Sequence, residues 1–259
     1  MLIAFASAKG APGVTTTVNV LGDVWPGDVL VADFDPAGGD LALRHRDPSG
    51  QPLDPERGLL SLAAAARRGV AQNELTYHVQ TIDGGLNIVS GISRPEQVAG
   101  IGAAWPALTH SLRTAEADVL VDCGRVTPGT PLMPVLTSAD AVVFVAQPSI
   151  ESYAHLRERL HWLSEPLRIG ELGSTPVGVI LVTAPSDTSA ARDLDRLLQY
   201  AGLQVSVLGR IADDPKAVRA LYGQASRRLD RTLLVRSARE VANAVRSLGT
   251  SRIESAARR

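Results

Sequence analysis

The sequence predicts an α/β protein with three layers, in which helices cover both faces of a mainly parallel sheet of about seven strands. Apolar, β-branched runs recur along the chain, and most lack the polar alternation of a half-exposed sheet, as expected for buried parallel strands. Amphipathic segments separate these runs and supply the crossover helices that such a sheet needs. The seven runs are 2–6, 29–34, 86–90, 118–123, 141–147, 177–183 and 204–208.

Helix signals occupy the intervals between the strands. Ser93 and Glu96 have the spacing of a capping box, Ser149 precedes an apolar pattern of helical period, and Gly202 ends another. The helices are expected at 15–24, 55–68, from 93 toward 115, from 149 through 163, from 186 or 188 to 202, near 215–222 and at 235–248.

Length and composition indicate one globular domain. The chain has 259 residues, of which 45% are apolar and 20% charged, and it shows no internal repeat or low-complexity linker. We therefore expect a single domain over 1–249, followed by a flexible basic tail over 250–259. The one cysteine, Cys123, excludes an intrachain disulfide and favours a reducing compartment. No signal peptide or membrane anchor is recognisable, so a cytoplasmic location is expected.

Charge is distributed unevenly along the chain. The net charge is -1, yet residues 191–259 hold 14 Lys and Arg against 7 Asp and Glu. Such asymmetry is typical of solvated, arginine-rich helices, and it is also compatible with a surface for acidic partners, including non-specific DNA. The sequence leaves both interpretations open.

The segment from Ala8 to Thr15 has the spacing of a phosphate-binding loop, G-x-x-x-x-G-K-[ST], between a strand and a helix. Gly10, Gly13 and the hydroxyls of Thr15 and Thr16 are compatible with a loop whose backbone N–H groups face an anion.

Two substitutions and one proline weaken this loop motif. Ala8 replaces the first glycine, Val14 replaces the lysine that would meet the outer phosphates, and Pro12 has no N–H to donate. Lys9 lies in the same loop and is one of only two lysines in the chain. Losing a charged hydrogen bond at Val14 is expected to weaken nucleotide binding about tenfold to a hundredfold.

Polar residues follow the strands at the edge where ligands bind in open α/β sheets. Asp33 and Asp35 end the second apolar run, Asp122 lies in the fourth, and Thr183 ends the sixth. Carboxylates beside a phosphate require a divalent cation between them, so the sequence predicts Mg²⁺ at this edge. Taken alone, Asp33 and Asp35 are equally compatible with a simple turn before Pro36.

The segments AKGAPGVTTT, VLVADFDPAGGD and DVLVDCG together resemble the deviant Walker A ATPases of the ParA/MinD group, which belong to the P-loop NTPases. Ala11 and Val14 depart from the loop pattern of this group, K-G-G-x-G-K-T-[ST]. The segments GGDLALRH and LNIVSGISRPEQ are most similar to the CpaE/TadZ branch, whose members place pilus and secretion machinery. The matching loop positions are Lys9, Gly10, Gly13, Thr15 and Thr16.

This resemblance implies ATP and Mg²⁺ as ligands and a role for each matching residue. Lys9 would reach phosphates across a nucleotide-sandwich dimer, and Asp35 would orient the attacking water, so these two are the candidate catalytic residues. The candidate metal-binding residues are Thr15, Asp33, Asp35 and Asp122, and the candidate nucleotide contacts are Lys9, Gly10, Ala11, Pro12, Gly13, Val14, Thr15, Thr16 (at the α-phosphate) and Thr183.

Two function classes follow. The first is a cytoplasmic ATP-binding protein that dimerises through its nucleotide face and positions or regulates a pilus, secretion or partition assembly, with slow hydrolysis. The second is a pseudo-ATPase scaffold that has lost nucleotide binding and serves as a protein-interaction platform. Val14 and Pro12 support the second class, whereas the ordered acidic motifs support the first.

Overall fold

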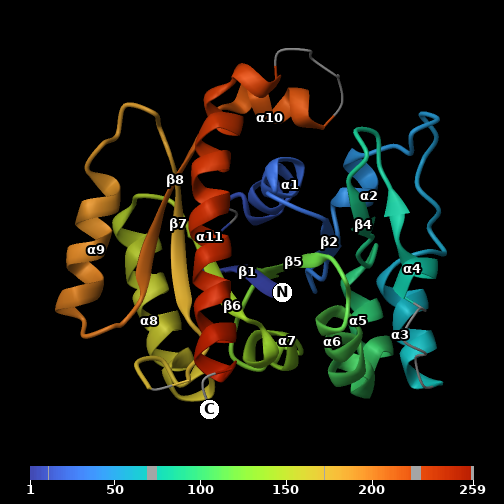
Figure 1. Cartoon of the computed structure of the whole chain (residues 1–259), viewed down its shortest axis with the longest axis horizontal. Coiled ribbons are helices and arrows are strands. Elements are labelled where there is room, and N and C mark those ends of the chain that lie inside the picture. The colour runs from blue at the N-terminus through green and yellow to red at the C-terminus, as the bar shows by residue number, and fades with distance from the viewer. Residues whose placement is uncertain (11, 69–74, 172, 223–228, 258–259) are drawn as a thin grey trace.

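The computed structural model describes residues 1–10, 12–68, 75–171, 173–222 and 229–257, with side chains described as far as Arg252. One sheet runs through the centre, with the strand order β3-β4-β2-β5-β1-β6-β7-β8. Helices cover both of its faces, as Figure 1 shows. The three-layer α/β/α architecture predicted from the sequence is therefore confirmed.

The sheet has eight strands among the described residues, rather than about seven. The additional strand, β3, has two residues and pairs antiparallel with β4, whereas all other pairings are parallel. Its sequence, Gln80–Thr81, has no apolar run that could reveal it. The strands are β1 Leu2–Ser7, β2 Val29–Asp33, β3 Gln80–Thr81, β4 Asn87–Val89, β5 Asp118–Arg125, β6 Ala141–Ala146, β7 Val177–Thr183 and β8 Ser206–Ala212.

The helices agree with the expected order but differ in detail. The single helix expected from 93 toward 115 is divided into four short elements, and the side chain of Gln97, rather than Glu96, accepts the backbone N–H groups of Ser93 and Arg94. The α-helices are α1 Val14–Val24, α2 Leu41–Arg44, α3 Leu59–Arg67, α4 Leu75–His78, α5 Val98–Ile101, α6 Trp105–Arg113, α7 Met133–Ser138, α8 Ile150–Leu167, α9 Ala190–Tyr200, α10 Pro215–Leu221 and α11 Leu233–Ala257. The 3-10 helices are η1 Pro95–Gln97, η2 Gly102–Ala104 and η3 Leu229–Arg231.

Two apolar cores separate the three layers. Along β1, alternate side chains enter opposite cores, with Leu2 and Ala4 on one side and Ile3 and Phe5 on the other. The first core is covered by α3 and by α6 to α9, and the second by α1, α10 and α11. Burial on both faces explains why the strands read as continuous apolar runs.

The last helix extends further than expected. The helix expected at 235–248 runs through Gly249, because α11 continues to Ala257. Thr250 contacts the sulfur of Met1, and the guanidinium of Arg252 donates to the carbonyl oxygen of Ala139. The proposed tail therefore begins as a docked helix. Among the described residues, no helix combines the length and apolar character needed to cross a membrane.

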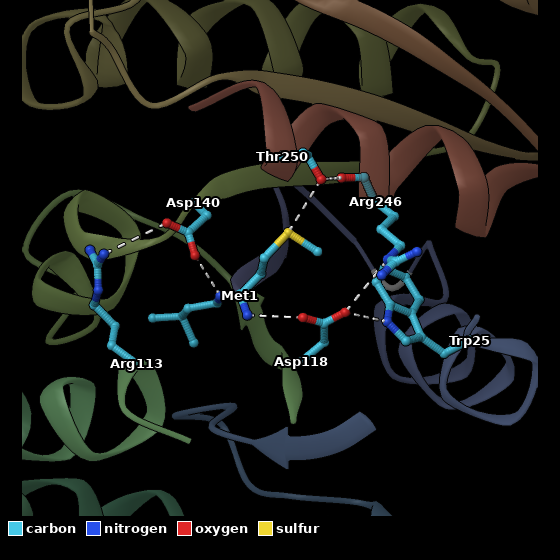
Figure 2. A network of polar contacts seen from close by, with 8 residues as sticks. Met1, Trp25, Arg113, Asp118, Asp140, Arg246 and Thr250 are labelled. Carbon is cyan, nitrogen blue, oxygen red and sulfur yellow. Dashed lines mark hydrogen bonds and ion pairs between the residues drawn. The ribbon is translucent and has the colours of Figure 1, made fainter. Parts of the chain in front are cut away.

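A polar network at the opposite end of the sheet from the loop fixes the start of β1 (Figure 2). The Asp118 carboxylate accepts from the Met1 ammonium and from the Trp25 indole N–H, both at 2.9 Å. Arg246 of α11 approaches the same carboxylate at 3.8 Å. Asp118 thus links β1, β5, the end of α1 and α11, which are the elements that position the loop.

Replacing Asp118 by Ala should lower the free energy of unfolding by about 1–3 kcal/mol, because the Trp25 N–H loses its acceptor in a partly buried position. Urea denaturation measures this change. The matched control is Asp230→Ala, which breaks an exposed pair with Arg239 and should cost less than about 1 kcal/mol. Equal effects of the two substitutions would contradict a structural role for the Asp118 network.

Candidate functional site

Two carboxylates face each other across neighbouring strands at the carboxyl edge of the sheet. Asp33 ends β2, and its Cα is paired in register with that of Asp122 in β5. Neither side chain is exposed to solvent. Asp35 follows after a further two residues and is half-buried. The structure thus brings together the three predicted aspartates, as the alignment of strand ends in a parallel sheet requires.

Glycines make room for the first carboxylate. Asp33 accepts the backbone N–H of Leu41 at 3.2 Å and that of Asp35 at 3.4 Å. A Cβ atom on Gly39 would lie 2.7 Å from its Oδ2, and one on Gly91 would lie 2.9 Å from its carboxyl carbon. The glycines that follow the D-x-D-P motif and strand β4 therefore serve the packing of Asp33.

Gly124 has a comparable role beside Asp35. Its φ of +56° lies in the left-handed region, and a Cβ atom there would be 2.2 Å from the carboxyl carbon of Asp35. The Asp35 carboxylate also accepts the N–H of Ala37 at 2.8 Å. Asp35 is thus held against the end of β5. In the sequence, the glycine of DVLVDCG indicates a close approach at this position, but it does not indicate that Asp35 is the residue that approaches.

The electrostatics of the pair favour a cation. Burial and then the charge of Asp122 raise the pKa of Asp33, and burial raises the pKa of Asp122 against the opposing effects of Thr15 and the Gly124 N–H. Oδ2 of Asp122 is buried and has no hydrogen-bond partner among the described residues. A buried carboxylate oxygen without a donor is costly, and a divalent cation would satisfy it.

The loop before α1 retains the geometry of an anion site at a helix N-terminus. Gly10 and Gly13 have φ values of +70° and +93°, and Gly13 caps α1 without any side-chain hydrogen bond to the first turn. The backbone N–H groups there are consequently available to an anion. Pro12 is buried, and Val14 is 6% exposed and packs in the core beneath α1. Ala11 lies outside the described residues.

Lys9 is exposed and lies on the α8 side of the loop. Its ammonium is 3.0 Å from Nε2 of His155, and its charge lowers the pKa of Glu151 at the start of α8, after the effects of hydrogen bonding and burial. The structure does not bring Lys9 to the aspartates. The sequence does not reveal this contact, because a contact across 146 residues leaves no local pattern.

The two threonines of the loop have different surroundings. Thr15 lies beside Asp122 and lowers its pKa, which favours the charged form; a metal contact at Thr15 remains a prediction. The hydroxyl of Thr16 accepts a hydrogen bond from Tyr222 at 3.1 Å. The guanidinium of Arg44 lies 4.7 Å from the centre of the Tyr222 ring. Neither Tyr222 nor Arg44 was foreseen, since Tyr222 is 206 residues from its partner.

Thr183 lies at the carboxyl edge but away from the carboxylates. It ends β7, which β6 separates from β1, and its hydroxyl donates to the Asp187 carboxylate at 3.3 Å. The observed contact belongs to the turn that precedes α9. A nucleotide contact at Thr183 remains a prediction.

Comparison with known proteins identifies the fold. No protein-family model matches the sequence, and the search of curated proteins also gives no match. Solved structures do match, with 12–19% identity. A ParA family ATPase from Chlorobium tepidum is 19% identical, with 93% of this chain and 98% of that chain covered and a TM-score of 0.72. MinD from Pyrococcus horikoshii, complexed with Mg-ADP, is 17% identical, with 97% and 98% covered and a TM-score of 0.69. A plasmid partition protein from Borrelia burgdorferi, bound to AMPPNP, is 13% identical, with 95% and 98% covered and a TM-score of 0.65.

The chain has the fold of the ParA and MinD ATPases. In this ParA/MinD fold, the loop before α1 and the aspartates of β2 and β5 occupy one sheet edge, the usual ligand site of open α/β sheets. Among the described residues, no group of three or more His, Cys, Asp or Glu side chains forms a metal site by itself. The two carboxylates of Asp33 and Asp122 suit Mg²⁺, which is commonly held by one or two carboxylates together with phosphates and waters.

Stability should depend on pH through the aspartate pair. Because their pKa values are raised, Asp33 and Asp122 keep protons in the folded state at pH values where the unfolded state has released them. The stability that these protons contribute is lost as pH rises from the ordinary value of 3.8 through the raised value of Asp33, about 8. Asp122→Asn removes one charge while its amide oxygen still accepts the Gly124 N–H. The free energy of unfolding of this variant should therefore exceed that of the native chain by about 1–3 kcal/mol between pH 5 and pH 8.

Urea denaturation across this range measures the gain. Asp47→Asn is the control, because the pKa of the exposed Asp47 is lowered by its hydrogen bond with Ser49, so the carboxylate stays charged throughout this range. A constant difference between Asp122→Asn and the native chain at every pH would show that the pair is not strained by its charge.

Proposed function

We propose that the chain is a ParA/MinD-like protein that binds ATP with Mg²⁺ at the carboxyl edge of the sheet. In this proposal it dimerises through that face in the cytoplasm and positions or regulates a larger assembly. The observation that carries the proposal is the buried pair of Asp33 and Asp122, with one unpartnered oxygen, beside an uncapped helix N-terminus. A cation and a phosphate together would satisfy both halves of this arrangement.

The residues divide the work of binding. The backbone N–H groups at the start of α1 would hold phosphate oxygens, and Asp33 and Asp122 would hold Mg²⁺ together with the Thr15 hydroxyl. Bound Mg²⁺ would supply positive charge for the phosphate oxygens. Val14 contributes no charge, so the positive charge in the loop comes from Lys9, which must leave His155 to reach a phosphate.

Asp35 is suited to holding a water molecule. It is half-buried, accepts the Ala37 N–H and has its carboxylate against Gly124, so its orientation is restricted. Burial raises the pKa of Asp35 above its ordinary value. Hydrolysis of the terminal phosphate bond by a water at this carboxylate would be slow, since Val14 offers no charge to the transition state. Asp35 and Lys9 are the proposed catalytic residues.

The alternative is a scaffold with this fold that no longer binds nucleotide. Three contacts favour it: Val14 packs in the core, Thr16 accepts from Tyr222, and Lys9 is held at His155. Each of these occupies a group that a nucleotide would use. The partner in either case, whether of a pilus, secretion or partition system, belongs to the proposal, as does non-specific DNA binding by the arginine-rich helices of 191–259.

Titration calorimetry with ATP and Mg²⁺ separates the two functions. Val14→Lys restores a charged phosphate contact and should raise ATP affinity about tenfold to a hundredfold. Val14→Met is the matched control, because it changes packing without adding charge, and its affinity should stay within a few-fold of the native value. If neither the native chain nor Val14→Lys binds ATP at millimolar concentration, the scaffold function is the correct one.

Asp35→Asn should abolish most hydrolysis while leaving ATP affinity within a few-fold. The amide cannot accept a proton from water, so the rate of phosphate release should fall about a hundredfold or more. Light scattering should then show the dimer persisting with ATP. Asp54→Asn, an exposed aspartate that also accepts a nearby backbone N–H, is the control. A variant that hydrolyses ATP at the native rate removes Asp35 from the mechanism.

A further inference from the structure

Tyr222 joins the loop before α1 to two segments that are far from it in the sequence. It follows α10, which lies on the same side of the sheet as α1 (Figure 1). Its hydroxyl donates to the Thr16 hydroxyl at 3.1 Å. The Arg44 guanidinium lies 4.7 Å from the centre of its ring, and the His45 ring centre lies 5.3 Å away in a T-shaped arrangement. One tyrosine thus contacts both α1 and the end of α2.

The ring of Tyr222 is held in place by residues that are themselves held. Arg44 pairs with the Asp40 carboxylate one turn earlier, and Nε2 of His45 lies 2.9 Å from the Asn19 amide of α1. Burial lowers the pKa of His45 to about 4, so the imidazole is uncharged at neutral pH and does not repel Arg44. The position of the tyrosine hydroxyl is therefore set by contacts of the ring as well as by its own hydrogen bond.

The surroundings of the hydroxyl determine where its hydrogen points. Burial raises the pKa of Tyr222 against the opposing effects of Thr16, Arg44 and Asn19, so the hydroxyl stays protonated at neutral pH. An arginine side chain has no acceptor atom, and the side-chain oxygen of Asn19 receives no hydrogen bond from the described residues. The Thr16 oxygen is therefore the acceptor.

This direction leaves the hydrogen of Thr16 for another acceptor. Phosphate ester oxygens accept hydrogen bonds and carry no hydrogen at neutral pH, so a threonine can hold them only by donating. Thr16 is the third residue of α1 and is half-buried, and side chains of a helix tilt toward its N-terminus, where the backbone is uncapped. A lone pair occupied by Tyr222 also restricts the rotation of the Thr16 hydroxyl.

We propose that Tyr222 is a positioning residue for nucleotide binding, whose hydroxyl orients Thr16 so that the Thr16 hydrogen is directed to a phosphate oxygen. This inference rests on the proposed function, in which Thr16 is a nucleotide contact. Because the donor is oriented before the nucleotide arrives, binding loses less rotational freedom. If a nucleotide had to displace this hydrogen bond, the contact would instead oppose binding, so the two effects differ in sign.

Titration calorimetry with ATP and Mg²⁺ measures the effect of Tyr222→Phe, which removes the hydroxyl and keeps the ring beside Arg44. The ATP affinity should fall about threefold to tenfold. The matched control is Tyr153→Phe, which removes a tyrosine hydroxyl that donates to the carbonyl oxygen of Ala190 at 3.2 Å. Its ATP affinity should stay within about twofold of the native value. Both changes remove one oxygen atom, and urea denaturation verifies that both variants fold.

A double-mutant cycle with Thr16→Val separates positioning from packing. Valine keeps the shape of threonine and replaces its hydroxyl by a methyl group. If Tyr222 acts through Thr16, adding Tyr222→Phe to Thr16→Val should leave the ATP affinity of Thr16→Val unchanged within about twofold. An equal loss in both backgrounds would assign Tyr222 to packing and overturn the proposal.

Two other results would also overturn it. One is an unchanged ATP affinity in Tyr222→Phe, and the other is an increased affinity, which would mean that the contact holds Thr16 away from the phosphate. In both cases the native chain binds ATP, so the proposed function stands. If the native chain does not bind ATP at millimolar concentration, the proposed function fails and this inference fails with it.

Discussion

The pairing of β2 with β5 places two buried carboxylates opposite each other, and the neighbouring residues of the candidate site are arranged around their mutual repulsion. Register alignment puts Asp33 opposite Asp122, both without solvent access. Glycines at 39 and 91 leave only enough space for the first carboxylate, and Asp122 keeps one oxygen without a donor. Apolar residues at these two positions would make the folded state more stable, because burying two like charges is unfavourable. The pair is therefore best explained by a ligand that brings positive charge.

The loop presents the opposite situation, with groups for an anion but little positive charge of its own. Gly13 begins α1 with its N–H groups uncapped, while Val14 is packed into the core. The one lysine of the loop is held by His155 on α8. A nucleotide with Mg²⁺ would satisfy both sets of groups at this sheet edge, since the cation would bind the carboxylates and the phosphates would bind the helix N-terminus. The loop therefore offers backbone N–H groups of the kind that hold a phosphate, without a lysine at position 14.

Much of this was predictable from sequence, and the failures share one cause. The apolar runs revealed seven strands, and the strand-end rule brought Asp33, Asp35 and Asp122 to one edge. Strand β3 was not predicted, because its two polar residues form a strand by pairing with β4 and show no apolar run of their own. Contacts such as Tyr222 with Thr16, Lys9 with His155 and Gly124 with Asp35 join segments that only the tertiary structure brings together. Local spacing identifies groups at strand ends, but it does not identify what packs against them.

Helix α8 shows how one element serves several demands on the site. Its apolar side, with Leu156 and Leu160, packs in the core and fixes the helix on the sheet. Its start holds Lys9 through His155, so the charge available to the loop depends on the position of α8. One turn further on, Arg159 lies over the ring of Trp162, and its buried Nε has no hydrogen-bond partner among the described residues. Because His155 belongs to a helix fixed by the core, the place of Lys9 in this structure depends on the packing of α8 against the sheet as well as on the loop itself.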